Sequence, residues 1–389
     1  MRRFFWFLVP HTLFLAATTL FDMFVAFYFY KFGTGSFVAP LAFTAAAWAV
    51  VPLGHSLGAS LSRSISLPAC LKIGAIATGA TFALVAALAT ISVPWWALLP
   101  VGVVYGLARS IYWTARHQID YRVSRAGHRD NYFGWQTSLS TGISTALGIV
   151  CGIAVEAFPQ VGYTAVFGLG AILLVLAALS VREHPKEYGS FSAGKLRQLT
   201  SLNPAFRRVF LASILRGANH TIPVAIQVFT FAALSRELPV AGLSGFGAAL
   251  ALGIGGMVSH RVRPGHRRGI AWIAASMLLV LGAALALMPT GLVGSTYLIL
   301  GPIAGILLVI PTLAADNTIF SHDDSVVAEY AVAREIGHAI GRLATAAPLV
   351  FLLTNPANVG PYLLLLSVAY PAQVLLLMGR RSASLSDWT

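Results

Sequence analysis

Ionisable side chains within long apolar stretches are the residues of this sequence that could do chemistry. A charged group at membrane depth is costly, and it usually faces a water-filled cavity or an opposite charge. Asp22 stands near the middle of such a stretch, in the run TTLFDMF. A carboxyl group there can hold a proton, and it can ionise when a cation or a cationic substrate arrives. We therefore predict that Asp22 binds protons or substrate.

A second group of charges recurs at helical spacing near the end of the chain, in AREIGHAIGR. Arg334, His338 and Arg342 stand four residues apart, so they share one face of a helix. Glu335 lies beside this stripe and can pair with His338 or Arg342. The pattern indicates either a closed internal ion-pair network or a cavity wall that binds an anionic group or relays protons.

A third polar face lies in the middle of the chain. Arg216, Asn219 and His220 stand at positions i, i+3 and i+4 of an expected helix. Pro223 follows them and tends to break a helix, because it has no amide hydrogen. Broken helices often border transporter sites. We predict these three polar residues as substrate- or proton-binding residues, with a buried core histidine as the alternative for His220.

The fourth predicted span contributes Arg109 and Trp113, which are four residues apart and share a face. Arg109 is deep enough in the span to line a cavity, and Trp113 would suit an amphiphilic organic molecule. Arg116 and His117 stand nearer the end of this span and are interpreted as interface anchors.

A metal site is kept as an alternative. Asp22, Met23 and His220 could together supply oxygen, sulfur and nitrogen ligands to a transition metal. Apart from this alternative, no metal and no cofactor is predicted. The two cysteines, Cys70 and Cys151, imply neither a disulfide framework nor a zinc site.

The composition indicates the structure that must position these residues. Of 389 residues, 57% are apolar and 10% are charged, against about 45–50% and about 25% in soluble domains. This excludes a soluble enzyme, a disordered chain and a disulfide scaffold. Apolar runs of about 20 residues suit spanning helices, whereas barrel strands alternate over about ten. The fold class predicted is an all-α membrane protein.

Twelve transmembrane helices are expected, six on each side of a polar segment. The predicted spans are 4–32, 38–61, 67–91, 94–118, 131–157, 162–181, 206–234, 240–259, 270–288, 294–319, 326–353 and 360–378. The first is interpreted as a span and not as a signal peptide. The domains follow as an N-terminal six-helix half (1–181), a cytoplasmic linker (182–204), a C-terminal six-helix half (205–380) and a cytoplasmic tail (381–389).

The distribution of lysine and arginine sets the orientation. With the N-terminus in the cytoplasm, the outer loops hold only Lys31 and Arg236, and most of the other basic residues lie in the inner loops, linker and tail. Both termini are therefore expected in the cytoplasm of a bacterium whose inner membrane holds the protein. The net charge of +13 is explained by this bias, so no nucleic-acid partner is expected.

The two halves show a weak internal repeat at an offset of about 198 residues. Tyr132 then falls on Tyr330, and Gly58–Arg63 falls on Gly256–Arg261. Both loops read Gly-x-x-x-x-Arg at the end of a predicted span.

Twelve spans, a cytoplasmic linker and these two basic loops resemble the major facilitator superfamily over essentially the whole chain. The sequence departs from the usual loop motif of that family, since Ser62 and His260 stand where it has an aspartate. The resemblance implies two pseudo-symmetric halves that rock about a central site. It also implies gating roles for Arg63 and Arg261, and a monomer.

Asp316 and Asn317 end the tenth predicted span. By the repeat offset they fall close to Arg116 and His117. We therefore predict Asp316 and Asn317 as gating residues or contacts between the halves.

The function predicted is proton-coupled secondary transport of a small organic solute that is anionic, zwitterionic or amphiphilic. Protons, the solute and the lipid bilayer would be its partners. The alternatives are transition-metal transport and a non-transporting assembly factor or sensor on the same fold. No enzyme activity is expected, because GHSLG at 54–58 lies inside a predicted span and lacks the strand-to-helix setting of a nucleophile motif.

Overall fold

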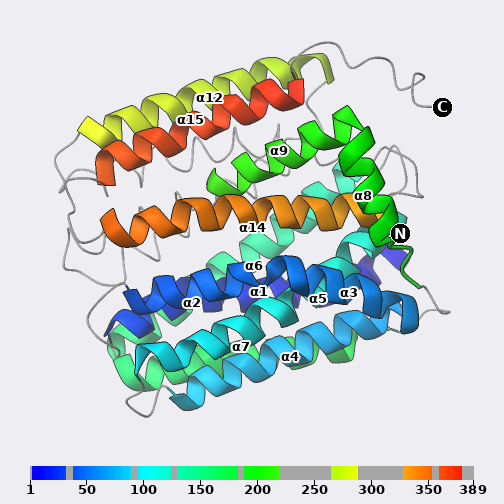
Figure 1. Cartoon of the computed structure of the whole chain (residues 1–389). Helices are drawn as coiled ribbons and strands as arrows, with labels where there is room; N and C mark the ends of the chain where they lie inside the picture. Colours follow the sequence, from blue (N-terminus) through cyan, green and yellow to red (C-terminus); the bar gives the residue numbers. More distant parts are fainter. Residues whose placement is uncertain are drawn as a thin grey trace.

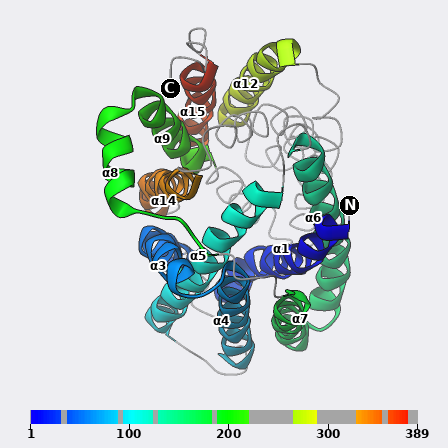
Figure 2. The same ribbon diagram turned by 90° about the vertical axis from the view of Figure 1, so that its right-hand side faces the viewer.

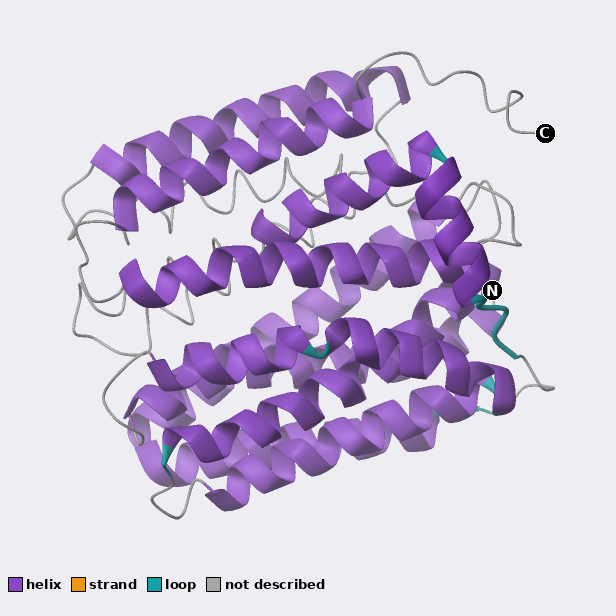
Figure 3. Ribbon diagram, in the orientation of Figure 1, coloured by secondary structure: helices purple, strands orange, loops and turns teal. Residues whose placement is uncertain are grey.

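The computed structural model describes residues 2–31, 38–88, 94–123, 129–182, 188–219, 264–287, 327–352 and 359–378. In these ranges the chain is helical apart from short turns and contains no strand (Figure 3). The predicted all-α fold is confirmed.

The N-terminal helix group covers the first six predicted spans. Its helices are α1 (Arg2–Phe29), α2 (Val38–Ala49), α3 (Val51–Ser64), α4 (Leu67–Leu88), α5 (Leu98–Val123), α6 (Arg129–Ala157) and α7 (Pro159–Ser180). The second predicted span is divided into α2 and α3 at Val50. The division has a local cause, because Pro52 in the first turn of α3 has no amide hydrogen to donate to the preceding turn.

The C-terminal helix group is described in part. Its helices are α9 (Pro204–Asn219), α12 (Pro264–Leu287), α14 (Val327–Leu352) and α15 (Val359–Met378), which fall on predicted spans 7, 9, 11 and 12. The eighth and tenth predicted spans lie outside the described residues. The predicted linker contains a further helix, α8 (Ala193–Leu202), whose first turn is capped by the Ser192 hydroxyl.

Four of the described segments are long and apolar enough to cross a membrane. They are Leu8–Phe29, Val38–Ser64, Leu67–Leu88 and Val161–Ser180, of 20 to 27 residues each. A crossing of the hydrocarbon core takes about 20 residues, so each of them can span it.

The helices pack as two groups that meet along α14. In the N-terminal group, α4 packs against α5 and α7, and α1 packs against α6 and α7. In the C-terminal group, α9 packs against α14 and α15, and α12 packs against α15. Helix α14 also contacts α2, α3 and α5, so it forms the described junction between the groups (Figures 1 and 2).

Two glycines allow close approach of neighbouring helices. A Cβ atom added to Gly74 of α4 would lie 2.6 Å from the backbone nitrogen of Tyr112 in α5. A Cβ atom added to Gly217 of α9 would collide with the carbonyl oxygen of His338 in α14. Small residues at such crossings are typical of helix contacts in membranes.

We expect Gly74→Ala to destabilise the protein by about 1–3 kcal/mol, because the new methyl group overpacks a backbone contact. The measurement is thermal unfolding of the purified protein in detergent. Gly168→Ala is the matched control, since nothing lies within 4 Å of its added Cβ atom. Equal melting temperatures for the two variants would show that the α4–α5 crossing is looser than described.

Candidate functional site

Asp22 forms an ion pair with Arg109 across the N-terminal helix group. Its neighbour Phe21 is buried in the core and stacks on Phe82, so Asp22 points to another side of α1. Arg109 Nη1 donates to Asp22 Oδ2 at 2.8 Å, and the Tyr105 hydroxyl donates to Oδ1 at 2.7 Å. The same Arg109 nitrogen donates to the Tyr105 oxygen at 2.8 Å.

This Asp22–Arg109 pair is only partly covered by the protein. The Asp22 side chain is 44% exposed and the Arg109 side chain is 34% exposed. Both stand near the middle of predicted spans, where ionised groups are found beside water-filled cavities or partners. The structure thus brings together two residues that the sequence singled out separately.

Arg342 of α14 faces the same region from the other helix group. Its guanidinium lies 5.8 Å from the ring centroid of Trp48 in α2, a cation–π contact that crosses between the groups. Arg342 also interacts electrostatically with Asp22, Arg109 and Arg216. Charges from α1, α5, α9 and α14 therefore converge on one interior region.

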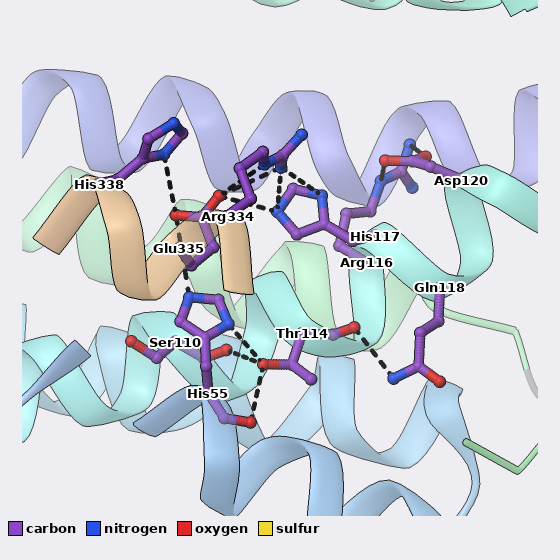
Figure 4. Close-up of polar contacts among 10 residues, drawn as sticks. All are labelled: His55, Ser110, Thr114, Arg116, His117, Gln118, Asp120, Arg334, Glu335 and His338. Atoms are coloured by element: carbon purple, nitrogen blue, oxygen red, sulfur yellow. Dashed lines mark hydrogen bonds and ion pairs between the residues drawn. The ribbon is translucent and has the colours of Figure 1, made fainter. Parts of the chain in front are cut away.

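A second cluster of polar residues joins α3, α5 and α14. We call it the interhalf cluster, and it consists of His55, His117, Arg334, Glu335 and His338 (Figure 4). Arg334 Nη2 lies 2.8 Å from Nε2 of His117 and 3.1 Å from Oε1 of Glu335. Since His117 belongs to α5, these contacts hold the two helix groups together.

Glu335 is the common partner within the interhalf cluster. Its Oε2 atom lies 3.5 Å from Nδ1 of His338 and 4.0 Å from Nε2 of His55, and its Oε1 atom lies 3.5 Å from Nε2 of His117. The Thr114 hydroxyl contacts Nδ1 of His55 at 2.7 Å and orients that ring. All five cluster side chains are 14% exposed or less. Of the two partners predicted for Glu335, His338 or Arg342, the structure has an ion pair with His338.

Residues of the predicted linker contact the bundle at the end that holds the interhalf cluster. The Gly189 amide donates to the Ser62 carbonyl in α3 at 2.7 Å, and the Ser192 amide donates to Oε1 of Glu329 in α14 at 2.7 Å. Phe191 packs with residues of α3 and α14. The segment therefore contacts both helix groups at the end where α3 finishes and α14 begins.

Arg116 and His117 differ from the sequence interpretation, which made them interface anchors. Arg116 is fully buried. It forms an ion pair with Asp120 at 2.6 Å, and Tyr132 of α6 hydrogen-bonds to both residues. These partners compensate the buried guanidinium, so it need not reach the membrane surface. His117 is the contact of α5 with Arg334.

The other residues that the sequence predicted for the site lie in different surroundings. Trp113 packs against the rings of His11 and His117, each at 5.2 Å. Arg216 interacts electrostatically with His338 as well as with Arg342. Arg63 is exposed in the last turn of α3. His220, Arg261, Asp316, Asn317 and the side chain of Asn219 lie outside the described residues.

Sequence reasoning missed His55 and Tyr105 as site residues. His55 lies inside the GHSLG run, which was considered only as a nucleophile motif. The criterion that selected Asp22, an ionisable group within a predicted span, would also have selected His55. Tyr105 carried no comparable signal, because a tyrosine in an apolar span is ordinary.

The described part of the proposed metal site does not resemble a coordination sphere. Both oxygens of Asp22 accept hydrogen bonds from Arg109 and Tyr105. Met23 packs against Gly148 of α6. The described residues include no group of three or more His, Cys, Asp and Glu side chains that could hold a metal ion.

Known proteins resemble this chain in sequence and in structure. No protein-family model matches the chain. It is 23% identical over 363 residues to the uncharacterized protein YqgE of Bacillus subtilis (strain 168), which covers 90% of this chain and 83% of that protein.

Solved structures resemble the chain over nearly its full length. The major facilitator superfamily transporter FucP in its outward conformation has a TM-score of 0.70 at 13% identity, covering 98% of this chain and 99% of FucP. A bacterial homologue of the iron transporter ferroportin, in its outward-facing state, has a TM-score of 0.65 at 15% identity, covering 97% and 99%. The chain therefore has the fold of the major facilitator superfamily.

Proposed function

We propose that this chain is a secondary transporter that carries a small organic solute across the bacterial cytoplasmic membrane by alternating access. The observation that carries the proposal is the Asp22–Arg109 pair, a partly exposed ion pair near the middle of two predicted spans. Such a pair is costly in an apolar bundle unless it faces water or a ligand. The fold supports the proposal, because its two halves enclose a central site between them.

The charges around the Asp22–Arg109 pair favour a solute with an anionic group. Among the described residues, Arg109, Arg216 and Arg342 face the two carboxylates of Asp22 and Glu335 in this region. A guanidinium binds carboxylate and phosphate groups well, because its donors form a planar fork. Trp48 adds an aromatic face beside Arg342, which suits an organic body attached to the anionic group. An anionic or zwitterionic solute is the class that we propose.

We assign the end of the bundle that holds the interhalf cluster and the linker contacts to the cytoplasm. The orientation predicted from lysine and arginine places the end of α3, the start of α14 and the linker on that side. The interhalf cluster and the linker contacts would then seal the cytoplasmic side, while Asp22 stays accessible from outside. The similarity to two outward-facing structures supports this assignment.

Coupling to protons is proposed at Asp22. A carboxyl group that exchanges an arginine partner for a proton changes the charge of the central region by one unit. The E. coli protein FucP, similar in structure, is a fucose:proton symporter, which supports a proton as the coupling ion here.

We expect a ligand to be found by thermal shift of the purified protein against organic anions, amino acids, sugars, nucleosides and divalent metals. A ligand at about 100 times its dissociation constant should stabilise the folded state by about 2.7 kcal/mol. The shift should occur with an anionic or zwitterionic compound and be lost in Arg342→Ala. Arg207→Ala removes an exposed arginine of α9 and is the matched control.

Other outcomes of that screen would overturn the assignment. A shift with divalent metals alone would favour the metal-transport alternative. No shift with any compound, in a protein that unfolds cooperatively, would favour a non-transporting role on the same fold.

Asp22→Asn should abolish flux driven by a pH gradient in proteoliposomes, because the amide accepts the Tyr105 hydrogen bond but cannot take up a proton. Tracer flux of the compound that binds is measured with and without the gradient. Glu156→Gln, at an exposed carboxylate of α6, should leave the dependence on the gradient unchanged. Gradient-driven flux that persists in Asp22→Asn would exclude this residue as the coupling site.

A further inference from the structure

We propose that Nε2 of His117 is a proton-binding site, and that a proton bound there separates the two helix groups at the interhalf cluster. The inference deepens the proposed function, on which it rests, by naming the contact that must break when the cytoplasmic side opens. It assigns this role to the residue that contacts Arg334 across the junction.

The geometry requires the facing nitrogen of His117 to be an acceptor. Arg334 Nη2 lies 2.8 Å from Nε2 of His117, and a guanidinium can only donate. This nitrogen therefore carries no proton in the closed arrangement. The arginine contact is the shortest one at this ring: the same guanidinium nitrogen lies 3.3 Å from Nδ1 of His117, and Oε1 of Glu335 lies 3.5 Å from Nε2.

The charge balance of the interhalf cluster opposes a further proton. Among the described residues, Glu335 supplies one negative charge to the cluster, and Arg334 at 3.1 Å pairs with it. A proton on His117 would set a second cation against the Arg334 guanidinium in a buried site, where an uncompensated charge is costly. It would also convert the acceptor of the cross-junction hydrogen bond into a second donor.

Charged groups face His117 from both helix groups, and among them the cationic Arg334 opposes a proton there whereas Glu335 and Asp120 favour one. His55 of α3 and His338 of α14 share the single carboxylate of Glu335. Arg216 and Arg342 add positive charge beside His338. On the α5 side, Arg116 and Asp120 are paired with each other and nearly neutral together, and the imidazole of His11 contacts the neighbouring Trp113 ring.

Proton binding and separation of the helix groups are therefore linked. When α5 and α14 move apart, His117 loses the Arg334 donor and reaches water, where an imidazolium is well solvated. A ligand that binds one of two states shifts the equilibrium toward that state. The open arrangement binds the proton, so acidification should favour it.

The test measures the distance between the two helix groups at this end, without any substrate. Spin labels are placed at Ser64→Cys in α3 and Arg208→Cys in α9, two exposed positions, in a background with Cys70→Ala and Cys151→Ala. A solvated histidine titrates near pH 6.5. We therefore expect the ratio of long to short distances to rise about tenfold between pH 8 and pH 5.5.

Two substitutions at His117 separate its roles. His117→Gln keeps an acceptor for Arg334 but cannot titrate, so the short distance should persist at both pH values. His117→Leu removes the acceptor, so the long distance should dominate at both. His266→Gln, at an exposed histidine of α12, should respond to pH as the parent protein does.

A parent-like pH response in His117→Gln would overturn the proposal, and so would a parent protein whose distances do not change with pH. If His117→Leu fails to fold, the glutamine variant alone decides. These distances are independent of the transport measurements. A pH-dependent distance without solute binding would contradict the proposed function only, and solute transport with pH-independent distances would contradict this inference only.

Discussion

The cost of an uncompensated charge in an apolar bundle is the constraint on which the arrangement of this protein depends. Two arginines within the N-terminal group each have a carboxylate close by, Arg109 with Asp22 and Arg116 with Asp120. Both arginines belong to α5, and the Arg109–Asp22 pair joins this helix to α1. The Arg109–Asp22 pair restricts the rotation of α5 relative to α1, because a turn of one residue would move Arg109 away from Asp22.

Helix α14 repeats this principle on the other side of the junction. Arg334 and Glu335 form part of the sealed interhalf cluster, and Arg342 lies two turns further on, over Trp48. The same helix thus contributes to the interhalf cluster and to the partly exposed central region. An α-helix moves as a rigid element over this length. Any movement of α14 relative to α5 that separates the interhalf cluster must therefore also change the central region around Arg342.

Much of this arrangement could be predicted from the sequence, and the limits have physical causes. Apolar length predicted the helices, and charge in apolar stretches selected Asp22, Arg109 and Arg334. Periodicity gives the face of one helix but not the partner that packs on it. The pairing of Asp22 with Arg109, residues 87 positions apart, and the contact of His117 with Arg334 could therefore not be predicted. The same limit applies to Arg116, which looked like a surface anchor until Tyr132 and Asp120 proved to surround it.

Charge can also connect the central region to the interhalf cluster. Glu335 and Arg342 are seven residues apart on α14, a rise of about 10 Å, and they interact electrostatically. Two unit charges at that separation interact by about 1–2 kcal/mol at an effective dielectric constant of about 20. An anion bound at Arg342 would lower the positive potential at the cluster and make a proton on His117 less costly. For an anionic solute, as proposed above, anion and proton would then favour each other's binding.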